Sequence, residues 1–469
     1  MLRFLLPPMK IRLLLPVFAL LLSVLRAADD PAPPAPAPID GFTYVKTLGR
    51  ISEYTLDANG LQVLLMPDHS APVLTFLVTY HVGSRNEVTG TTGATHLLEH
   101  LMFKGSLNYE RSRGTGYDQI LEPLGAGYNA TTWLDRTDYF ATIASDHLPE
   151  VIQLEADRMR NLSLRETDRR PEMFVVRNEF ERGENSPGNA LEKEIFAAAF
   201  MAQPYHHPTI GWRSDIEAVS IAKLREFYDT FYWPNNATVS VIGDITPTVA
   251  LELVKKSYGA IPRSPKPIPQ IYTEEPEQTY PRRVGLRRAG QLGVVEIAHK
   301  MPAATDPDYP ALSVLGSILG DGKNSRLYKA LTDKGLSTGA STGPNFNHDP
   351  TLFFTFIPLA PGVKHEDAEK AALAEIERLK KDGVTDHEVA TATAMMLAGS
   401  AFQRDGTSAV ASNLNECIAC GDWQLYYTVD DAVKKVTAAD VQRVAQHYLV
   451  EDQSTTGWFV PVLPSDTKP

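Results

Sequence analysis

The sequence predicts an α+β protein made of two similar α/β domains, and three observations lead to this expectation. A chain of 469 residues is longer than one hydrophobic core usually organises, so two domains are expected. In the first half, short apolar runs typical of strands alternate with amphipathic patterns typical of helices. After a proline-rich stretch over residues 264–269, the second half repeats this order of patterns, as a duplicated domain would.

The N-terminus predicts export. Residues 1–28 have the three parts of a secretory signal peptide, with Lys10 and Arg12 before an apolar run over 13–25 and Ala27 with Ala28 after it. Because this run is short and contains Pro16, we expect a periplasmic or secreted protein without a stable membrane span, although an uncleaved anchor stays open. Residues 29–41 form a Pro/Ala-rich tether that cannot build a core.

The elements of both domains follow from hydrophobic periodicity. The N-terminal domain, 42–263, should contain a helix around His96 together with the following strands and helices: strands 61–66, 73–82, 129–133 and 139–143, and helices 147–161 and 221–231. A linker over 264–283 follows, rich in proline and acidic residues. The C-terminal domain, 284–469, should begin with a strand over 294–299 and a helix over 311–319. This second helix contains no histidine, so only the first domain is expected to bind a metal.

The residues His96-Leu97-Leu98-Glu99-His100 carry the strongest functional signal. On a helix, positions three or four apart share a face, so both imidazoles and the carboxylate can point into one small volume. Neutral imidazoles bind Zn²⁺, and a carboxylate beside the ion can take a proton from metal-activated water. This spacing is the inverzincin signature. The alternative is that the three side chains only bond one another in a core, but an ionised Glu there is costly without a cation.

Two longer segments extend the pattern into a family resemblance. Residues 82–87 and 92–105 resemble the zinc-site segment of the M16 peptidases, the pitrilysin and insulinase family. In that family a Glu on a later helix is the third zinc ligand, and residues 171–179 resemble the segment that carries it. The resemblance implies that Glu179 joins His96 and His100 as a ligand of Zn²⁺, and that Glu172 supports the site from outside. It also implies two domains of sheet covered by helices that enclose a substrate chamber.

The helix around Glu179 has an alternative interpretation as the solvated face of a charged helix, because five glutamates lie between residues 166 and 184. We expect it to begin at an Asp168 cap with Pro171 in the first turn, and to end near Gly183. Seven residues separate Glu172 from Glu179, about 10 Å along a helix axis, so only one of them can bind the metal directly.

Residues Asn129 and Ala130 resemble the family's edge-strand segment beside the zinc. An extended peptide can add there as a further strand, bound mainly through its backbone, and this suits an enzyme that accepts varied sequences. In isolation, Gly125 to Asn129 would be an ordinary hairpin turn, and that alternative stays open.

Charge and cysteine content limit the partners. A net charge of −12 without a cluster of Lys or Arg argues against nucleic acid or an anionic membrane surface. Cys417 and Cys420 form one Cys-x-x-Cys, for which a local disulfide or a pair of quiet thiols is expected rather than a redox centre.

The second half departs from family members whose C-terminal half completes the active site. Thr332 and Thr338 lie near the positions of an Arg and a Tyr that hold the substrate carbonyl in such members. The chain is also about half as long as a full pitrilysin-type enzyme. The resemblance therefore implies an M16B-type subunit, a zinc endopeptidase with Glu99 as general base, that acts on peptides or unfolded segments with a homologous partner as a hetero- or homodimer. An idle scaffold subunit and a LuxS-type lyase are the alternatives; a lyase would need a Cys ligand in the first half.

Overall fold

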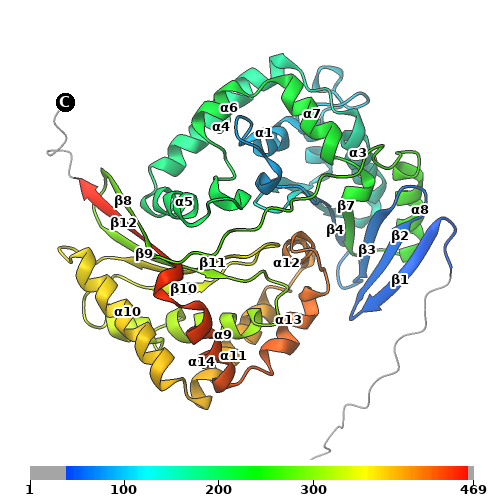
Figure 1. The fold of residues 1–469 in the computed structure, drawn as a ribbon. Coiled ribbons are helices and arrows are strands. Elements are labelled where there is room, and N and C mark those ends of the chain that lie inside the picture. The colour runs from blue at the N-terminus through cyan, green and yellow to red at the C-terminus, as the bar shows by residue number, and fades with distance from the viewer. Residues whose placement is uncertain (1–37, 463–469) are drawn as a thin grey trace, which may run out of the picture. The chain divides into compact units, whose positions relative to one another are not determined.

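The structure, a computed structural model, describes residues 38–462. The predicted signal peptide and residues 29–37 of the predicted tether lie outside this range. The described chain contains two mixed β-sheets and helices on their faces (Figure 1). The expected α+β architecture is therefore confirmed.

The first sheet has seven strands in the order β1-β2-β3-β7-β4-β6-β5, so β5 is an edge strand. All neighbours are antiparallel except the parallel pair β3 and β7. Its members are β1 (Phe42–Leu48), β2 (Ile51–Leu56), β3 (Leu61–Pro67), β4 (Val73–Tyr80), β5 (Gly127–Thr132), β6 (Thr137–Ala144) and β7 (Ala237–Gly243).

The second sheet repeats the inner part of the first. Its order, β10-β11-β9-β12-β8, places one parallel pair, β8 and β12, beside three antiparallel strands, as β3 and β7 stand beside β4, β6 and β5. Its members are β8 (Arg282–Ala289), β9 (Val294–Met301), β10 (Ser341–Pro344), β11 (Thr351–Pro358) and β12 (Ser454–Val462). The internal echo in the sequence thus corresponds to a repeated topology.

The helices also recur in order. In the first half they are α1 (Ala94–Leu101), α2 (Tyr117–Leu121), α3 (Leu148–Asn161), α4 (Glu166–Glu184), α5 (Pro187–Ala199), α6 (Arg213–Ala218), α7 (Ile221–Phe231) and α8 (Pro247–Tyr258). In the second half they are α9 (Tyr309–Gly320), α10 (His365–Asp382), α11 (Asp386–Phe402), α12 (Thr407–Ala419), α13 (Leu425–Val433) and α14 (Ala438–Tyr448). By topology, α9 occupies the place of α1 but carries no histidine.

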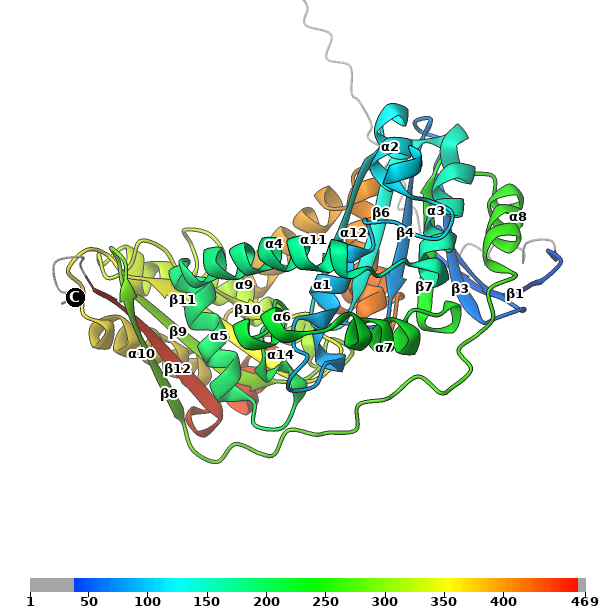
Figure 2. The same ribbon diagram turned by 90° about the horizontal axis from the view of Figure 1, so that it is seen from above.

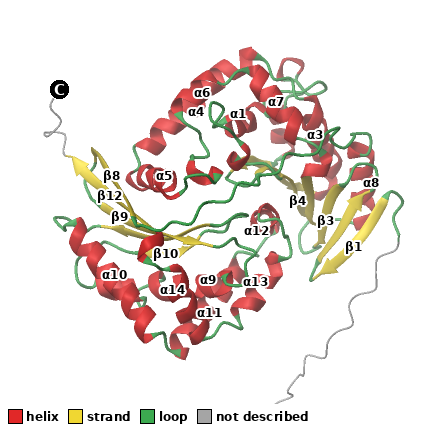
Figure 3. Cartoon of the chain, in the orientation of Figure 1, coloured by secondary structure: helices red, strands yellow, loops and turns green. Residues whose placement is uncertain are grey.

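Each half covers one face of the other half's sheet. Helix α12 packs on β4, β6 and β7, and helix α5 packs on β8, β9 and β12 (Figure 1). Strand alternation explains this, because Leu64 and Met66 of β3 point toward α12 while Val63 and Leu65 point into the core on the opposite face. On the second sheet, α9, α10, α11, α13 and α14 lie on the face opposite α5 (Figure 3). The two halves therefore share apolar cores.

Polar contacts reinforce the packing of α12. Thr79 of β4 donates a hydrogen bond to Asn415 at 2.6 Å, and the Arg136 guanidinium donates to Glu416 at 3.0 Å. The two cysteines lie at the end of the same helix. Cys417 and Cys420 are buried and unbonded to each other, which agrees with the expected pair of quiet thiols.

The segment between α8 and β8 has no helix or strand and appears in Figure 2 as the long green trace. The segment is nevertheless held in place. Glu275 accepts hydrogen bonds from the backbone N–H groups of Met201, Ala202 and Gln203, and Gln278 donates to the Ser454 carbonyl at 2.6 Å. Among the described residues, no helix is both long enough and apolar enough to cross a bilayer.

His299 on β9 gives a prediction about acid stability. Burial, together with the charge of Lys380, lowers the pKa of this histidine to about 4, whereas an unfolded chain would titrate near 6.5. Between these values the unfolded state binds more protons, so stability falls as the pH falls, by roughly 3 kcal/mol in all for this group. His299→Gln should reduce the slope of the free energy of unfolding against pH between about pH 6.5 and 4, as measured by urea denaturation. Replacement of the exposed His447 by Gln should keep the wild-type slope. Parallel curves for His299→Gln and wild type would contradict the assignment.

Candidate metal centre

The side chain of Glu87, to which the sequence pattern assigned no role, caps helix α1, and Gly93 allows the chain to enter this helix. Gly93 precedes the helix with φ of +82°, and a Cβ there would lie 2.4 Å from the Ile210 carbonyl oxygen, so only glycine fits. The buried carboxylate of Glu87 accepts hydrogen bonds from the N–H groups of Gly93 at 2.8 Å and Thr95 at 2.7 Å. A glutamate side chain thus caps this helix.

Helix α4 begins earlier than the sequence predicted. Its first residue is Glu166 and its N-cap is Arg165, so Asp168 is not the cap and Pro171 lies inside the helix. The expectation of a start at Asp168 was wrong. The physical reason is that ion pairs stabilise an additional turn, with Arg165 bound to Asp168 at 2.6 Å and Arg169 to Glu166 at 2.7 Å. The helix therefore continues through Pro171, although this residue has no N–H group to donate.

Helices α1 and α4 bring three ligand atoms together. The Nε2 atoms of His96 and His100 lie 3.3 Å apart, and the Oε2 atom of Glu179 lies 3.6 Å from each. Zn²⁺ binds nitrogen and oxygen at about 2.0 to 2.2 Å in a tetrahedron, for which the ligand atoms would lie roughly 3.3 to 3.5 Å apart. The donor set and its spacing therefore fit this ion.

The two imidazoles differ in their surroundings. Burial, with the nearby His100, lowers the pKa of His96 to about 3 and keeps this ring neutral. Burial also lowers the pKa of His100, but the hydrogen bond to Glu172 and the neighbouring carboxylates outweigh burial and raise it. Nδ1 of His100 lies 2.9 Å from Glu172, which leaves Nε2 free to face a cation. His96 Nδ1 is buried without a hydrogen-bond partner among the described residues.

Glu172 contacts the side of the His100 ring that faces away from the candidate ligand group. Its second oxygen lies 2.6 Å from Lys104 Nζ, so the carboxylate links a candidate ligand to a lysine at the end of the same helical segment. Burial raises the pKa of Glu172, but the bonds from His100 and Lys104 outweigh it and hold the pKa below its ordinary value. Lys104 was not assigned this role from the sequence.

We expect Glu172→Gln to weaken metal binding without abolishing it. The amide keeps the size of the side chain but removes the charge that orients His100, and outer residues of this kind typically contribute about 10- to 100-fold in affinity. Competition with a chromogenic chelator measures the change. Glu166→Gln, at the exposed start of α4, is the control and should bind metal like the wild type. Equal affinities for the Glu172 variant and the control would refute the role of Glu172.

Glu99 belongs to the same turn but not to the group of three ligand atoms. Its Oε2 accepts a hydrogen bond from Thr132 Oγ1 at 2.6 Å, which fixes the carboxylate beside the imidazoles. Burial raises the pKa of Glu99, and the charges of Asp138 and Glu179 add to the increase, although the Thr132 hydrogen bond opposes them. A carboxylate with a raised pKa is suited to accept a proton near neutral pH. Thr132 received no role from the sequence.

Strand β5 supplies the edge beside this centre. Ala130 is buried and Asn129 is exposed, as alternation along a strand requires. Because β5 pairs only with β6, its other backbone edge has no strand neighbour in the described sheet. Thr132, the last residue of β5, holds Glu99, so the edge and the candidate centre are joined directly.

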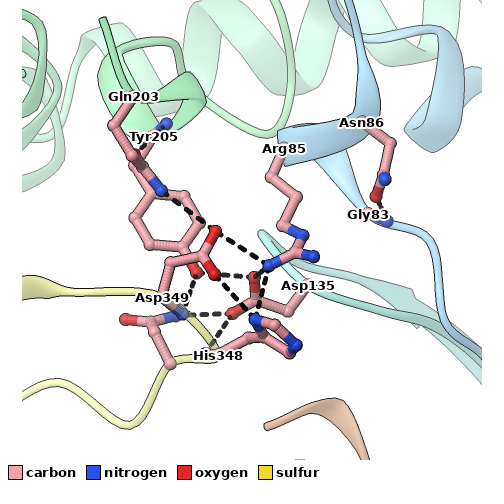
Figure 4. A network of polar contacts seen from close by, with 9 residues as sticks. Gly83, Arg85, Asn86, Asp135, Gln203, Tyr205, His348 and Asp349 are labelled. Atoms are coloured by element: carbon pink, nitrogen blue, oxygen red, sulfur yellow. Dashed lines mark hydrogen bonds and ion pairs between the residues drawn. The ribbon is translucent and has the colours of Figure 1, made fainter. Parts of the chain in front are cut away.

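A polar network holds the loop after β5 against the second half (Figure 4). Asp135 accepts a hydrogen bond from Tyr205 at 2.6 Å and one from the His348 N–H at 3.1 Å. The Arg85 guanidinium lies 2.8 Å from Asp349 and 2.7 Å from the His348 ring. The contacts with His348 and Asp349 join residues more than 200 positions apart, and sequence patterns did not indicate them.

The threonines at the expected Arg and Tyr positions make only local contacts. Thr332 and Ser337 share a hydrogen bond of 2.9 Å, and Thr338 donates to the Pro358 carbonyl at 3.4 Å. Both positions lie in the second half.

Comparison with known proteins places the chain in a family. Residues 62–212 match the profile described as insulinase (peptidase family M16), and residues 218–396 match the profile described as the peptidase M16 inactive domain. The zinc protease PqqE of Helicobacter pylori is 33% identical over 408 residues, which cover 86% of this chain and 91% of that protein. The chain belongs to peptidase family M16. The resemblance seen in the sequence is thus confirmed.

Two further proteins extend the likeness. The crystal structure of a protease from Helicobacter pylori aligns with a TM-score of 0.84 at 32% identity, covering 88% of this chain and all of that one (100%). The mitochondrial-processing peptidase subunit beta of Lentinula edodes is 24% identical over 421 residues, or 87% of this chain and 90% of that protein. The three candidate ligands of this M16 chain lie in the region that matches the insulinase profile, and none lies in the region that matches the inactive domain.

Proposed function

We propose that the chain is a zinc-dependent endopeptidase that hydrolyses peptides or unfolded polypeptide segments. The observation that carries this proposal is the convergence of His96, His100 and Glu179 within 4.8 Å of one another, next to the open edge of β5. Membership of family M16 and similarity to proteins named zinc proteases support it.

The chain's own residues would perform distinct parts of the reaction. His96, His100 and Glu179 would hold Zn²⁺, which when bound supplies Lewis acidity and lowers the pKa of water. Glu99, oriented by Thr132, would accept the proton released as water attacks the peptide carbonyl and then donate it to the leaving amine. The backbone of β5 at Asn129 and Ala130 would pair with the substrate as an added strand, which requires an extended segment and excludes folded chains.

We further propose that the chain acts with a homologous M16 partner, as a hetero- or homodimer. Thr332 and Thr338 offer no cation and no phenol to a developing oxyanion, so a second chain would have to supply such donors. Similarity to a protein named as a subunit, the mitochondrial-processing peptidase subunit beta, supports this arrangement. The signal-peptide pattern at residues 1–28 supports export to the periplasm or the exterior.

Metal analysis and peptide hydrolysis test the proposal. The purified mature chain should bind one equivalent of zinc, and chelation should abolish hydrolysis of an unstructured peptide library until zinc is restored. Co-purified homologous chains should raise the activity, and dilution should lower it. A chain that binds no zinc, or whose hydrolysis survives chelation, would overturn the zinc-peptidase proposal. Full activity that is unchanged at high dilution and without a partner would overturn the partner proposal alone.

A further inference from the structure

Two cavities lie near opposite ends of β5, and Glu179 of the candidate metal centre lines the second of them. The first, about 600 Å³, is lined by Phe103 and Tyr128 near the start of the strand and by the first turn of α4. The second, about 370 Å³, is lined by Trp133 just after the strand and by Glu179 and Phe180 near the end of α4. A peptide paired with β5 would therefore extend past both cavities.

The second cavity has apolar walls. Trp133 is 51% exposed, an unusual state for so large an apolar side chain. Phe180, Phe196 and Ile210 complete these walls. Such a surface can cover a long aliphatic chain and remove it from water.

The charged groups of this cavity are paired, with one exception. Glu184 lies 2.6 Å from Arg288 and also pairs with Lys193, so these charges compensate one another. Glu179 belongs to the candidate metal centre. Glu192 of α5 also lines the cavity, yet it makes no hydrogen bond or ion pair with any residue of the described range. Burial raises the pKa of its carboxyl.

A second carboxylate lies behind Glu192. On β9, Val294 and Ala298 point into the core beneath α5, and Glu296 shares their parity and therefore their face. Glu296 is 4% exposed and its Oε2 has no partner among the described residues. Burial raises its pKa well above the ordinary value, and the charge of Glu192 raises it further.

Neighbouring residues show that the two carboxylates face the same interface. Phe356 and Gly457 flank Glu296 on the adjoining strands. A Cβ on Gly188 would lie 3.4 Å from Phe356, and one on Gly457 would lie 2.8 Å from Ile195, so α5 meets the sheet at positions 188 and 195. Glu192 is four residues after the first and three before the second, which places it on this face of α5.

We propose that the second cavity receives a lysine or arginine side chain of the peptide substrate, with its aliphatic stem between Trp133 and Phe180 and its cation at Glu192. This inference rests on the proposed peptidase function and deepens it. A neutral or acidic side chain would leave the carboxylate desolvated and uncompensated, whereas an ammonium or guanidinium group would satisfy it. Glu296 would add negative potential from behind without direct contact.

Matched peptides test the inference. A series carrying lysine, norleucine or glutamate at each position around the cleaved bond should be compared on the zinc-loaded chain, by hydrolysis with its partner and by binding to the Glu99→Gln variant. The wild type should prefer lysine at one position. Glu192→Gln should reduce kcat/KM for the lysine peptide by about 10- to 100-fold and should not reduce kcat/KM for the norleucine peptide. Glu194→Gln, on the same helix with a side chain 40% exposed, is the matched control and should keep the preference.

The outcomes separate this inference from the proposed function. Peptide binding or hydrolysis without a preference for lysine, or a lysine preference that Glu192→Gln leaves intact, would overturn the inference and leave the peptidase proposal standing. A chain that neither binds nor cleaves any peptide of the series would overturn both. Glu192→Lys provides an independent readout, because it should shift the preference toward the glutamate peptide.

Discussion

Glu99→Gln is expected to retain zinc and to lose hydrolysis, with kcat lower by about 10²- to 10⁴-fold. The amide has nearly the same shape as the carboxylate and can still accept the 2.6 Å hydrogen bond from Thr132. It cannot accept a proton from water. Because Glu99 is not among the three convergent ligand atoms, its replacement should leave the metal affinity close to that of the wild type.

Two measurements check this prediction together. Metal content by mass spectrometry should match the wild type, while single-turnover hydrolysis of a fluorogenic peptide should be slow. Thr132→Ser is the control, since its hydroxyl can still orient Glu99 and turnover should stay near the wild-type value. If Glu99→Gln hydrolyses peptide at the wild-type rate, the general-base assignment is wrong.

Glu179→Gln should lose both metal and activity. A neutral amide is a weak ligand for Zn²⁺, and the charge that Glu179 brings within 3.6 Å of both imidazoles would be gone. We therefore expect zinc affinity to fall by more than the roughly 10- to 100-fold typical of outer residues, with hydrolysis falling in parallel at limiting zinc.

The neighbouring glutamate on α4 provides the control. Glu181 lies two residues later and faces Arg177 and Arg213 at 3.9 and 3.7 Å instead of the imidazoles. Glu181→Gln should bind zinc normally. Retention of stoichiometric, tight zinc by Glu179→Gln would show that the third ligand is another group, and zinc titration followed by calorimetry distinguishes the two results.

Much of the candidate metal site was predictable because it depends on local periodicity. His96, Glu99 and His100 lie within two turns of one helix, and helical spacing alone places them on one side. The absence of histidine over residues 312–319 likewise indicated that only one half carries the site. The start of α4 could not be predicted in this way, because ion pairs of Arg165 and Arg169 stabilise a turn that Pro171 was expected to exclude.

The sequence by itself determined the α+β class, the internal repeat, the helix that carries two candidate metal ligands and, through the family resemblance, the role expected of Glu179. Only the tertiary structure decided that α5 and α12 cross to cover the opposite sheet, that Thr132 orients Glu99, and that Glu192 and Glu296 face the same interface. Periodicity reports which face of an element is apolar, but not which distant element covers that face. Contacts between residues a hundred or more positions apart arise from packing, and one sequence carries no separate signal for them.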